Sequence, residues 1–175
     1  MKTPHLLLLV LLGLPAASAF PPTTPDAPKP IPRFQVSFFE PEKFADVKDS
    51  YSGTDRGRDA ILSDIKNYIV QRAAVYVPDG QKLAVTITDI DLAGDFEPGA
   101  GPQWEDVRLV KEIYPPRINL TFKLTDANGN VLKTGTRRLQ DLSFLMKLSV
   151  NNGDPLRYEK NLLDDWFRSD FGRAH

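Results

Sequence analysis

The segment from Ile118 to Arg138 constrains the fold most, because it carries the pattern of a β-hairpin. Residues 118–124 alternate between apolar and polar side chains without interruption, as expected of a strand with one buried face. Asp126-Ala127-Asn128-Gly129-Asn130 is rich in turn-forming residues, and a second strand-like run follows from Val131 to Arg138. A hairpin pairs its strands in antiparallel fashion, so the fold has to contain an antiparallel sheet.

Two further segments are predicted to extend this sheet. Arg33–Phe39 alternates, and Lys82–Leu92 begins in the same way. In the second segment the apolar face changes phase between Ile87 and Ile90, which indicates a β-bulge or the end of the buried part of the sheet. Residues 107–110 carry a weaker strand pattern and are predicted as a possible fifth strand.

Helical periodicity predicts one long helix and two shorter ones. The long helix is expected over Asp55–Tyr76, capped by Thr54 or Asp55. A short helix is expected over Leu142–Leu148, and Asp154-Pro155 suits the start of a last helix that ends near Phe167. The expected packing residues are Ile61, Ile65, Tyr68, Ile69, Ala73 and Tyr76 in the long helix, and Tyr158, Leu162, Leu163, Trp166 and Phe167 in the last one.

This order of elements predicts an α+β fold: a mainly antiparallel sheet of four to five strands, with the long helix packed on one face and a C-terminal helix. Residues 33–175 have the length of a single domain. Residues 20–32 are rich in proline, which disfavours helices and strand pairing, so they are predicted to form an extended tether.

Residues 1–19 have the composition of a secretory signal peptide. Lys2 precedes an apolar run from Leu6 to Leu12, and Ala17-Ser18-Ala19 matches the small-residue cleavage pattern. The run has about half of the ~20 apolar residues that cross a bilayer, although an uncleaved membrane anchor is the alternative. We expect cleavage near Ala19, no transmembrane span in the mature chain, and a periplasmic or secreted location.

The scarcity of cysteine and histidine excludes several kinds of chemistry. The chain has no cysteine, and its two histidines are His5, within the predicted signal peptide, and His175, the last residue. Disulfides, a lipid anchor on cysteine, Ser-His-Asp catalysis and zinc sites of His and Cys are therefore not expected. The net charge of −1 gives no electrostatic reason to expect a nucleic-acid partner. No cofactor is predicted.

An acidic segment is the first candidate site. Asp89, Asp91, Asp95 and Glu97 lie at a strand end and in a glycine-containing loop. Their oxygens could bind Ca²⁺, or two of them could act as an acid and base pair. Acidic residues at strand ends are also common as solvated groups, and the spacing does not match a helix-loop-helix calcium loop.

Three arginines form the second candidate set. If Arg108, Arg117 and Arg137 share one exposed sheet face, they would pair with Asp89 or Asp91. Such a lattice is either structural or a cleft of arginine and carboxylate that binds an anionic or peptide ligand.

One pair of motifs matches serine β-lactamases and penicillin-binding proteins. Ser63-Asp64-Ile65-Lys66 fits Ser-x-x-Lys, and Lys133-Thr134-Gly135 fits Lys-Thr-Gly. No Ser-Asp-Asn lies between them, Ser63 falls well inside the predicted long helix, and the chain is too short for the two-part fold around that site. We interpret the match as coincidence.

Longer motifs resemble the bacterial family known as domain of unknown function 3016 (DUF3016), and the resemblance covers nearly all of the chain after the tether. It implies exported proteins of Gram-negative bacteria, and it supplies no activity, cofactor or partner. The motifs are Val36-Ser37-Phe38-x-x-Pro41-Glu42-Lys43-Phe44, Thr88-Asp89-Ile90-Asp91-Leu92-Ala93-Gly94-Asp95-Phe96-Glu97-Pro98, Ile113-Tyr114-Pro115-Pro116-Arg117-Ile118, Asp154-Pro155-Leu156-Arg157-Tyr158-Glu159-Lys160 and Leu163-Asp164-Asp165-Trp166.

The sequence therefore predicts a non-enzymatic periplasmic module without catalytic residues that binds an envelope protein or a small ligand. The alternatives are a carboxylate-dependent hydrolase and a Ca²⁺-binding protein, both using Asp89, Asp91 and Asp95. The predicted ligand-binding residues are Asp89, Asp91, Asp95, Arg108, Arg117 and Arg137.

Overall fold

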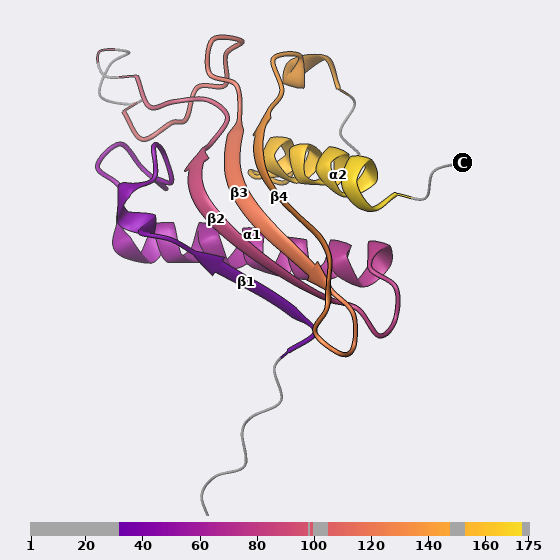
Figure 1. Ribbon diagram of the computed structural model, residues 1–175. Coiled ribbons are helices and arrows are strands. Elements are labelled where there is room, and N and C mark those ends of the chain that lie inside the picture. Colours follow the sequence, from indigo (N-terminus) through magenta and orange to yellow (C-terminus); the bar gives the residue numbers. More distant parts are fainter. Residues whose placement is uncertain (1–31, 98, 100–104, 148–152, 173–175) are drawn as a thin grey trace, which may run out of the picture. The chain divides into compact units, whose positions relative to one another are not determined.

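A four-stranded sheet dominates the computed structural model, which describes residues 32–97, 99, 105–147 and 153–172 (Figure 1). The predicted signal peptide and residues 20–31 of the predicted tether lie outside these residues. The sheet has the spatial order β1-β2-β3-β4, and β2–β3 and β3–β4 are antiparallel. The predicted α+β class is thus confirmed. The strands are β1 (Phe34–Phe38), β2 (Lys82–Asp91), β3 (Arg117–Thr125) and β4 (Val131–Gln140), and the helices are α1 (Asp55–Tyr76) and α2 (Arg157–Phe171).

Both helices pack on the same face of the sheet (Figure 1). Helix α1 connects β1 to β2, which pair in parallel because the crossover returns the chain to the same end of the sheet. Helix α1 contacts β1, α2 contacts β4, and the two helices contact each other. The residues between these layers that have no exposed surface include Ile65, Ile69, Ile87, Ile118, Leu120, Leu163 and Phe167.

Helix α1 begins and ends where the sequence predicts. Thr54 is its N-cap, and the Thr54 hydroxyl accepts a hydrogen bond from the Gly57 N–H at 2.9 Å. The buried face of the helix differs from the predicted one at its first position: Leu62 is buried, whereas Ile61, which was predicted to pack, is only partly buried. The other buried residues of this helix are Ile65, Ile69 and Ala73.

The predicted bulge in β2 is confirmed by a register shift between Ile87 and Asp89. The extra residue returns Ile90 to the helix-covered face, where it has no exposed surface. Asp91, which follows it, pairs in register with Arg117 of β3. The bulge thereby keeps the core intact up to the end of β2 and directs its last carboxylate away from the core.

Three local predictions are wrong. Residues 107–110 contribute only an isolated bridge from Leu109 to Asp95, because this segment pairs with a loop and not with the sheet. An α-helix was predicted over Leu142–Leu148, but the described part of this segment forms only a 3₁₀ turn, at Phe144–Met146. Helix α2 begins at Arg157, since the Asp154 carboxylate accepts the Leu156 N–H at 2.9 Å within the preceding turn, and it ends at Phe171, beyond the predicted end near Phe167.

Aromatic side chains hold α2 against β3. The Phe122 ring meets Trp166 edge to face, with the ring centroids 5.7 Å apart, and meets Phe171 in the same way at 5.4 Å. Gly135 of β4 lies beside this cluster, and a Cβ there would lie 3.1 Å from a ring carbon of Phe122. A side chain at this position would thus press on the aromatic ring, and its Cβ would lie 2.8 Å from a guanidinium nitrogen of Arg137.

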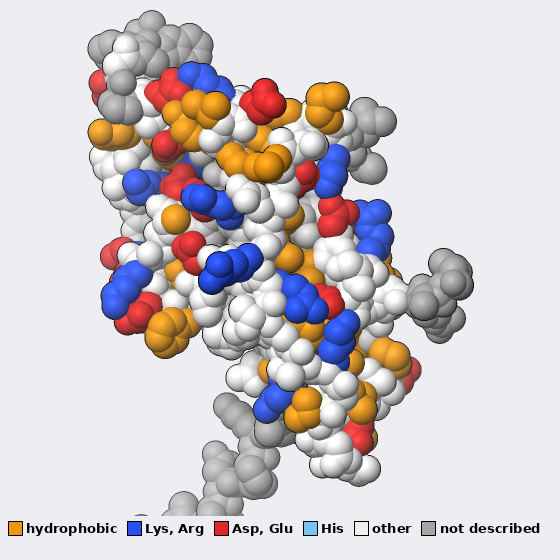
Figure 2. Space-filling model, turned by 45° about the horizontal axis from the view of Figure 1, so that its top comes forward, with side chains coloured by type: hydrophobic (Ala, Val, Ile, Leu, Met, Phe, Trp, Pro, Cys, Tyr) orange, Lys and Arg blue, Asp and Glu red, His pale blue; other side chains and the backbone are white. Residues whose placement is uncertain are grey.

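The opposite face of the sheet is polar. Ser37, Thr86, Thr121 and Thr136 lie in register across all four strands, and the hydroxyls of Ser37 and Thr86 are 3.0 Å apart. Figure 2 shows acidic and basic side chains interspersed over the face that it presents. Among the described residues, no helix is both long and apolar enough to cross a membrane.

Candidate functional site

The candidate site lies at the end of the sheet where β2 stops and β3 starts. Asp91 is the last residue of β2, Arg117 is the first of β3, and their side chains form an ion pair. Only one nitrogen of the Arg117 guanidinium is used in this pair, and the Arg117 side chain is 54% exposed. Further donors of the guanidinium consequently remain open to a ligand.

Residues 45–48 run alongside the end of β2 and form one wall of the site. The Asp46 N–H donates to the Ile90 carbonyl at 3.0 Å, and the Leu92 N–H donates to the Asp46 carbonyl at 3.2 Å. The Asp89 carboxylate accepts the Ala45 N–H at 2.9 Å. Asp89 therefore fixes the wall and does not line the site.

A largely buried ion pair joins this wall to the loop between β2 and β3. Two nitrogens of Arg108 contact the two carboxylate oxygens of Asp46 at 2.6 and 3.2 Å. Arg108 also donates to the carbonyls of Gly94 at 2.8 Å and Lys48 at 3.0 Å, and it lies over the Phe96 ring at 4.6 Å. A single guanidinium thus connects three segments, and the Asp46 oxygens are both occupied.

The loop after β2 folds back on itself just beyond this pair. The backbones of Asp95 and Leu109 exchange two hydrogen bonds of 3.0 and 2.8 Å, and the Gly94 N–H donates to the Tyr114 carbonyl at 3.0 Å. Gly94 has a φ of 81°, and a Cβ at this position would lie 2.7 Å from the Leu109 carbonyl oxygen. Only glycine lets the backbone at this position come so close to Leu109 with a positive φ.

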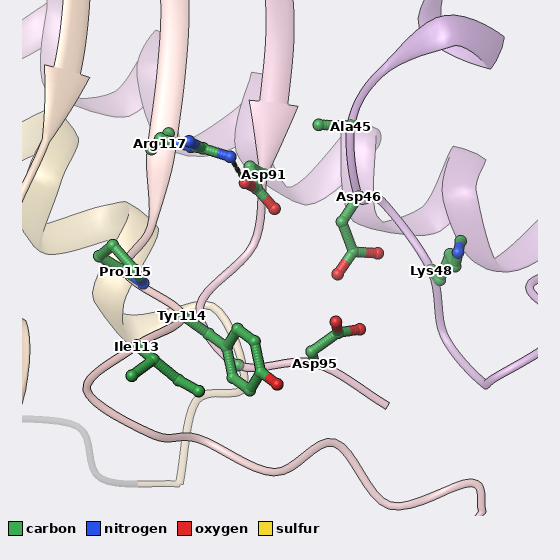
Figure 3. Close-up of a pocket in the computed structure, with 10 residues that line it drawn as sticks. Ala45, Asp46, Lys48, Asp91, Asp95, Ile113, Tyr114, Pro115 and Arg117 are labelled. Atoms are coloured by element: carbon green, nitrogen blue, oxygen red, sulfur yellow. Dashed lines mark hydrogen bonds and ion pairs between the residues drawn. The ribbon is translucent and has the colours of Figure 1, made fainter. Parts of the chain in front are cut away.

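These segments enclose an open cavity of about 370 Å³. Figure 3 shows that Asp46, Asp91 and Asp95 reach its edge from three different segments. Asp46 and Asp91 are paired with arginines, whereas Asp95, within the described residues, accepts only the N–H of Phe96, at 2.7 Å. The lining residues are Ala45, Asp46, Lys48, Asp91, Gly94, Asp95, Ile113, Tyr114, Pro115 and Arg117.

Glu97, the fourth carboxylate of the acidic segment, is held by other partners. Lys111 donates to both of its oxygens at 2.6 Å, and the Tyr114 hydroxyl donates at 3.1 Å. The hydrogen bond from Lys111 lowers the pKa of Glu97. Within the part of the chain that the structure describes, no three His, Cys, Asp or Glu side chains are grouped so that they could hold a metal ion.

The structure divides the six predicted ligand-binding residues. Asp91, Asp95 and Arg117 line the cavity, and Arg108 lies behind its wall. The predicted shared sheet face is wrong for two arginines: Arg108 lies in a loop and pairs with Asp46, and Arg137 pairs with Asp170 of α2 at 2.7 Å on the helix-covered side. The strand register decides which face Arg137 takes.

The β-lactamase-like motifs have structural explanations. Ser63 is exposed on the surface of α1. The Lys133 ammonium lies 2.8 Å from a carboxylate oxygen of Asp170, and Gly135 leaves room for the Phe122 ring.

Sequence reasoning missed two residues that shape the site. Asp46 has no local signal, because its partner Arg108 is 62 positions away. Glu159 could have been found: it lies three, four and seven residues before Leu162, Leu163 and Trp166, so it belongs to the buried stripe of α2.

Glu159 is a buried carboxylate of α2 that contacts the backbone just after the end of β2. It is 1% exposed, and its Oε1 accepts the Ala93 N–H at 2.7 Å, while Oε2 has no partner among the described residues. Burial raises the pKa of Glu159, and the Ala93 N–H and the charges of Arg108 and Arg157 oppose that shift only in part. The folded state thus favours the neutral acid more than the unfolded chain does.

The fold and the cavity together define a small α+β module with a polar cleft at one end of its sheet. The family described as "Protein of unknown function (DUF3016)" matches residues 32–169, and the chain belongs to this family. Neither a curated protein nor a solved structure matches the chain.

Replacing Glu159 by glutamine tests the account of the buried carboxylate. Because its pKa is raised in the folded state, the folded protein binds this proton more tightly than the unfolded chain does. The contribution of Glu159 to wild-type stability therefore falls as pH rises above about 4.3, the ordinary glutamate value. Glutamine does not ionise. The free energy of unfolding of Glu159→Gln minus that of the wild type should therefore increase as pH rises from 4 to 8, as measured by urea denaturation. A difference that is independent of pH would contradict the account.

Proposed function

We propose that this chain is an exported, non-enzymatic binding module whose ligand occupies the cavity between Asp91, Asp95 and Arg117. The ligand class is a small zwitterion: an amino acid or a short peptide with both ends free, in the envelope of a Gram-negative bacterium. The observation that carries the proposal is the Asp95 carboxylate, which lines the cavity and has no cationic partner among the described residues.

The two ends of a zwitterion match the two kinds of group in the cavity. An ammonium group can approach Asp95 and the oxygen of Asp91 that Arg117 does not use. A carboxylate can approach the open donors of Arg117 or the ammonium of Lys48, which also lines the cavity. Charge-assisted hydrogen bonds of this kind fix both the orientation and the selectivity of a bound ligand.

The alternatives receive less support from the geometry. A hydrolase or a calcium site built on Asp89, Asp91 and Asp95 needs the three carboxylates at one place, but Asp89 is bonded to the Ala45 N–H and does not line the cavity. The binding proposal needs only Asp91 and Asp95, which line the cavity.

Export is supported by the first nineteen residues, whose basic start, apolar run and Ala17-Ser18-Ala19 ending suit a cleaved signal peptide. The resemblance of the motifs after the tether to DUF3016, which implies exported proteins, agrees with it.

Trialanine with free or blocked ends tests the zwitterion proposal. The free peptide should shift the NMR amide signals of Asp91, Asp95 and Arg117, whereas N-acetylation or C-amidation should each weaken binding about tenfold, since each removes one charge-assisted contact. Asp95→Asn should weaken binding of the free peptide by about the same factor and leave N-acetyl-trialanine unaffected. Glu42→Gln is the matched control, because Glu42 is exposed and does not line this cavity. Equal binding of all peptide forms, or no binding at millimolar concentration, would refute the proposal.

The export proposal is tested by expressing the full chain in a Gram-negative host. Mass spectrometry of the periplasmic fraction should find a protein that starts at Phe20. Ala19→Arg should keep the signal peptide attached, because the residue before the cleavage point has to be small. A full-length protein confined to the cytoplasm would rule export out.

A further inference from the structure

A second cavity lies on the other side of the Asp46–Arg108 pair. It has a volume of about 340 Å³ and lies between α1, the turn that precedes α2 and the loop after β2. Arg108 lines this cavity, Asp46 lines the first one, and Lys48 lines both. The two cavities are therefore neighbours with different linings. The apolar residues of the second are Ala60, Ile61, Leu92, Ala93, Phe96, Pro155 and Leu156.

The rim of this second cavity is acidic. Asp49, Asp64 and Asp106 lie on it, together with the cations Lys48 and Arg108. Arg108 is already bonded to Asp46 and to two carbonyls, so Lys48 alone opposes three carboxylates. An apolar cavity with an excess of negative charge at its mouth is complementary to an apolar group that carries positive charge beside it.

The carboxylates of the rim are fixed to different degrees. Asp49 accepts the N–H and the hydroxyl of Thr54, both at 3.0 Å, and Asp106 accepts the Tyr51 N–H at 3.2 Å. Asp64 is exposed on α1 and makes no hydrogen bond or ion pair with the described residues. Two carboxylates are thus held in place, and a third is available to a ligand.

We propose that this cavity receives one large apolar side chain from a basic peptide segment of a partner protein, with lysine or arginine on either side of it. The carboxylates of the rim contact the flanking cations, and the apolar residues below them contact the inserted side chain. The same rim disfavours an anionic lipid surface, since like charges repel. The site does not depend on the zwitterion cavity, from which the Asp46–Arg108 pair separates it.

The experiment is an NMR titration of the purified protein with three blocked tripeptides. Acetyl-Lys-Phe-Lys-amide should shift the amide signals of Ala60, Asp64 and Ala93. Acetyl-Glu-Phe-Glu-amide, in which the charges are reversed, and acetyl-Lys-Ser-Lys-amide, in which the apolar group is lost, should each bind at least tenfold more weakly. All three peptides have blocked ends and so lack the terminal charges that the zwitterion cavity is proposed to bind. Asp95→Asn, which removes the carboxylate that a lysine ammonium could contact there, should leave the result unchanged.

Two substitutions at exposed positions of α1 locate the binding. Ala60 lines the cavity and is exposed, so Ala60→Trp should fill the cavity without disturbing the core and weaken binding of acetyl-Lys-Phe-Lys-amide at least tenfold. Asp64→Asn should weaken it about threefold, whereas Glu112→Gln, which removes the same charge outside both cavities, should not. Equal binding of the three peptides, or unchanged binding to Ala60→Trp, overturns the proposal. So does a stronger response of the same signals to phosphatidylglycerol vesicles, which would identify a membrane surface as the occupant.

Discussion

The Asp46–Arg108 ion pair is the interaction on which the loop end of this molecule depends. The described part of the loop between β2 and β3 has few strand pairings of its own. Arg108 attaches it to the segment beside β2 through three hydrogen bonds, to Asp46 and Lys48, and donates a fourth to Gly94 within the loop. Withdrawing these charges from water is costly, but the two-point contact with Asp46 and the two carbonyl acceptors satisfy the guanidinium. The pair also forms the partition between two cavities of opposite character.

The end of β2 determines where the Asp46–Arg108 pair lies between the two cavities. The bulge in β2 keeps Ile90 in the core and leaves Asp91 free to pair with Arg117 at the strand end. Glu159 supports the same strand end from the helix layer through the Ala93 N–H. The cavity walls therefore rest on the packed core, although the residues that line them come from loops. Such an arrangement suits a binding site that is formed before its ligand arrives.

Regular periodicity made most of the fold predictable. The hairpin of β3 and β4, the bounds of α1 and the bulge in β2 all follow from local patterns, since each depends on which residues of one segment face the core. The site was only partly predictable. Asp91 and Asp95 were visible as an acidic strand end, but Asp46 and Arg108 meet across 62 positions of chain without any periodic signal. The prediction for Arg137 was wrong because only the pairing register of β4 determines which face of the sheet its side chain lies on. The prediction for residues 107–110 was wrong because their apolar side chains belong to a loop and not to a strand of the sheet.

Hydrogen exchange of Arg108→Met tests the central role of this ion pair most directly. Removing one partner of a largely buried pair costs about 3 kcal/mol, or roughly a hundredfold in an opening equilibrium. Exchange at the amides of Asp95 and Leu109, which bond to each other behind Arg108, should therefore accelerate by about that factor. Arg137→Met, which breaks the pair between β4 and Asp170 of α2, should leave these two amides as protected as in the wild type. Unchanged protection of Asp95 and Leu109 in Arg108→Met would show that the loop stands without the ion pair, and the account would be wrong.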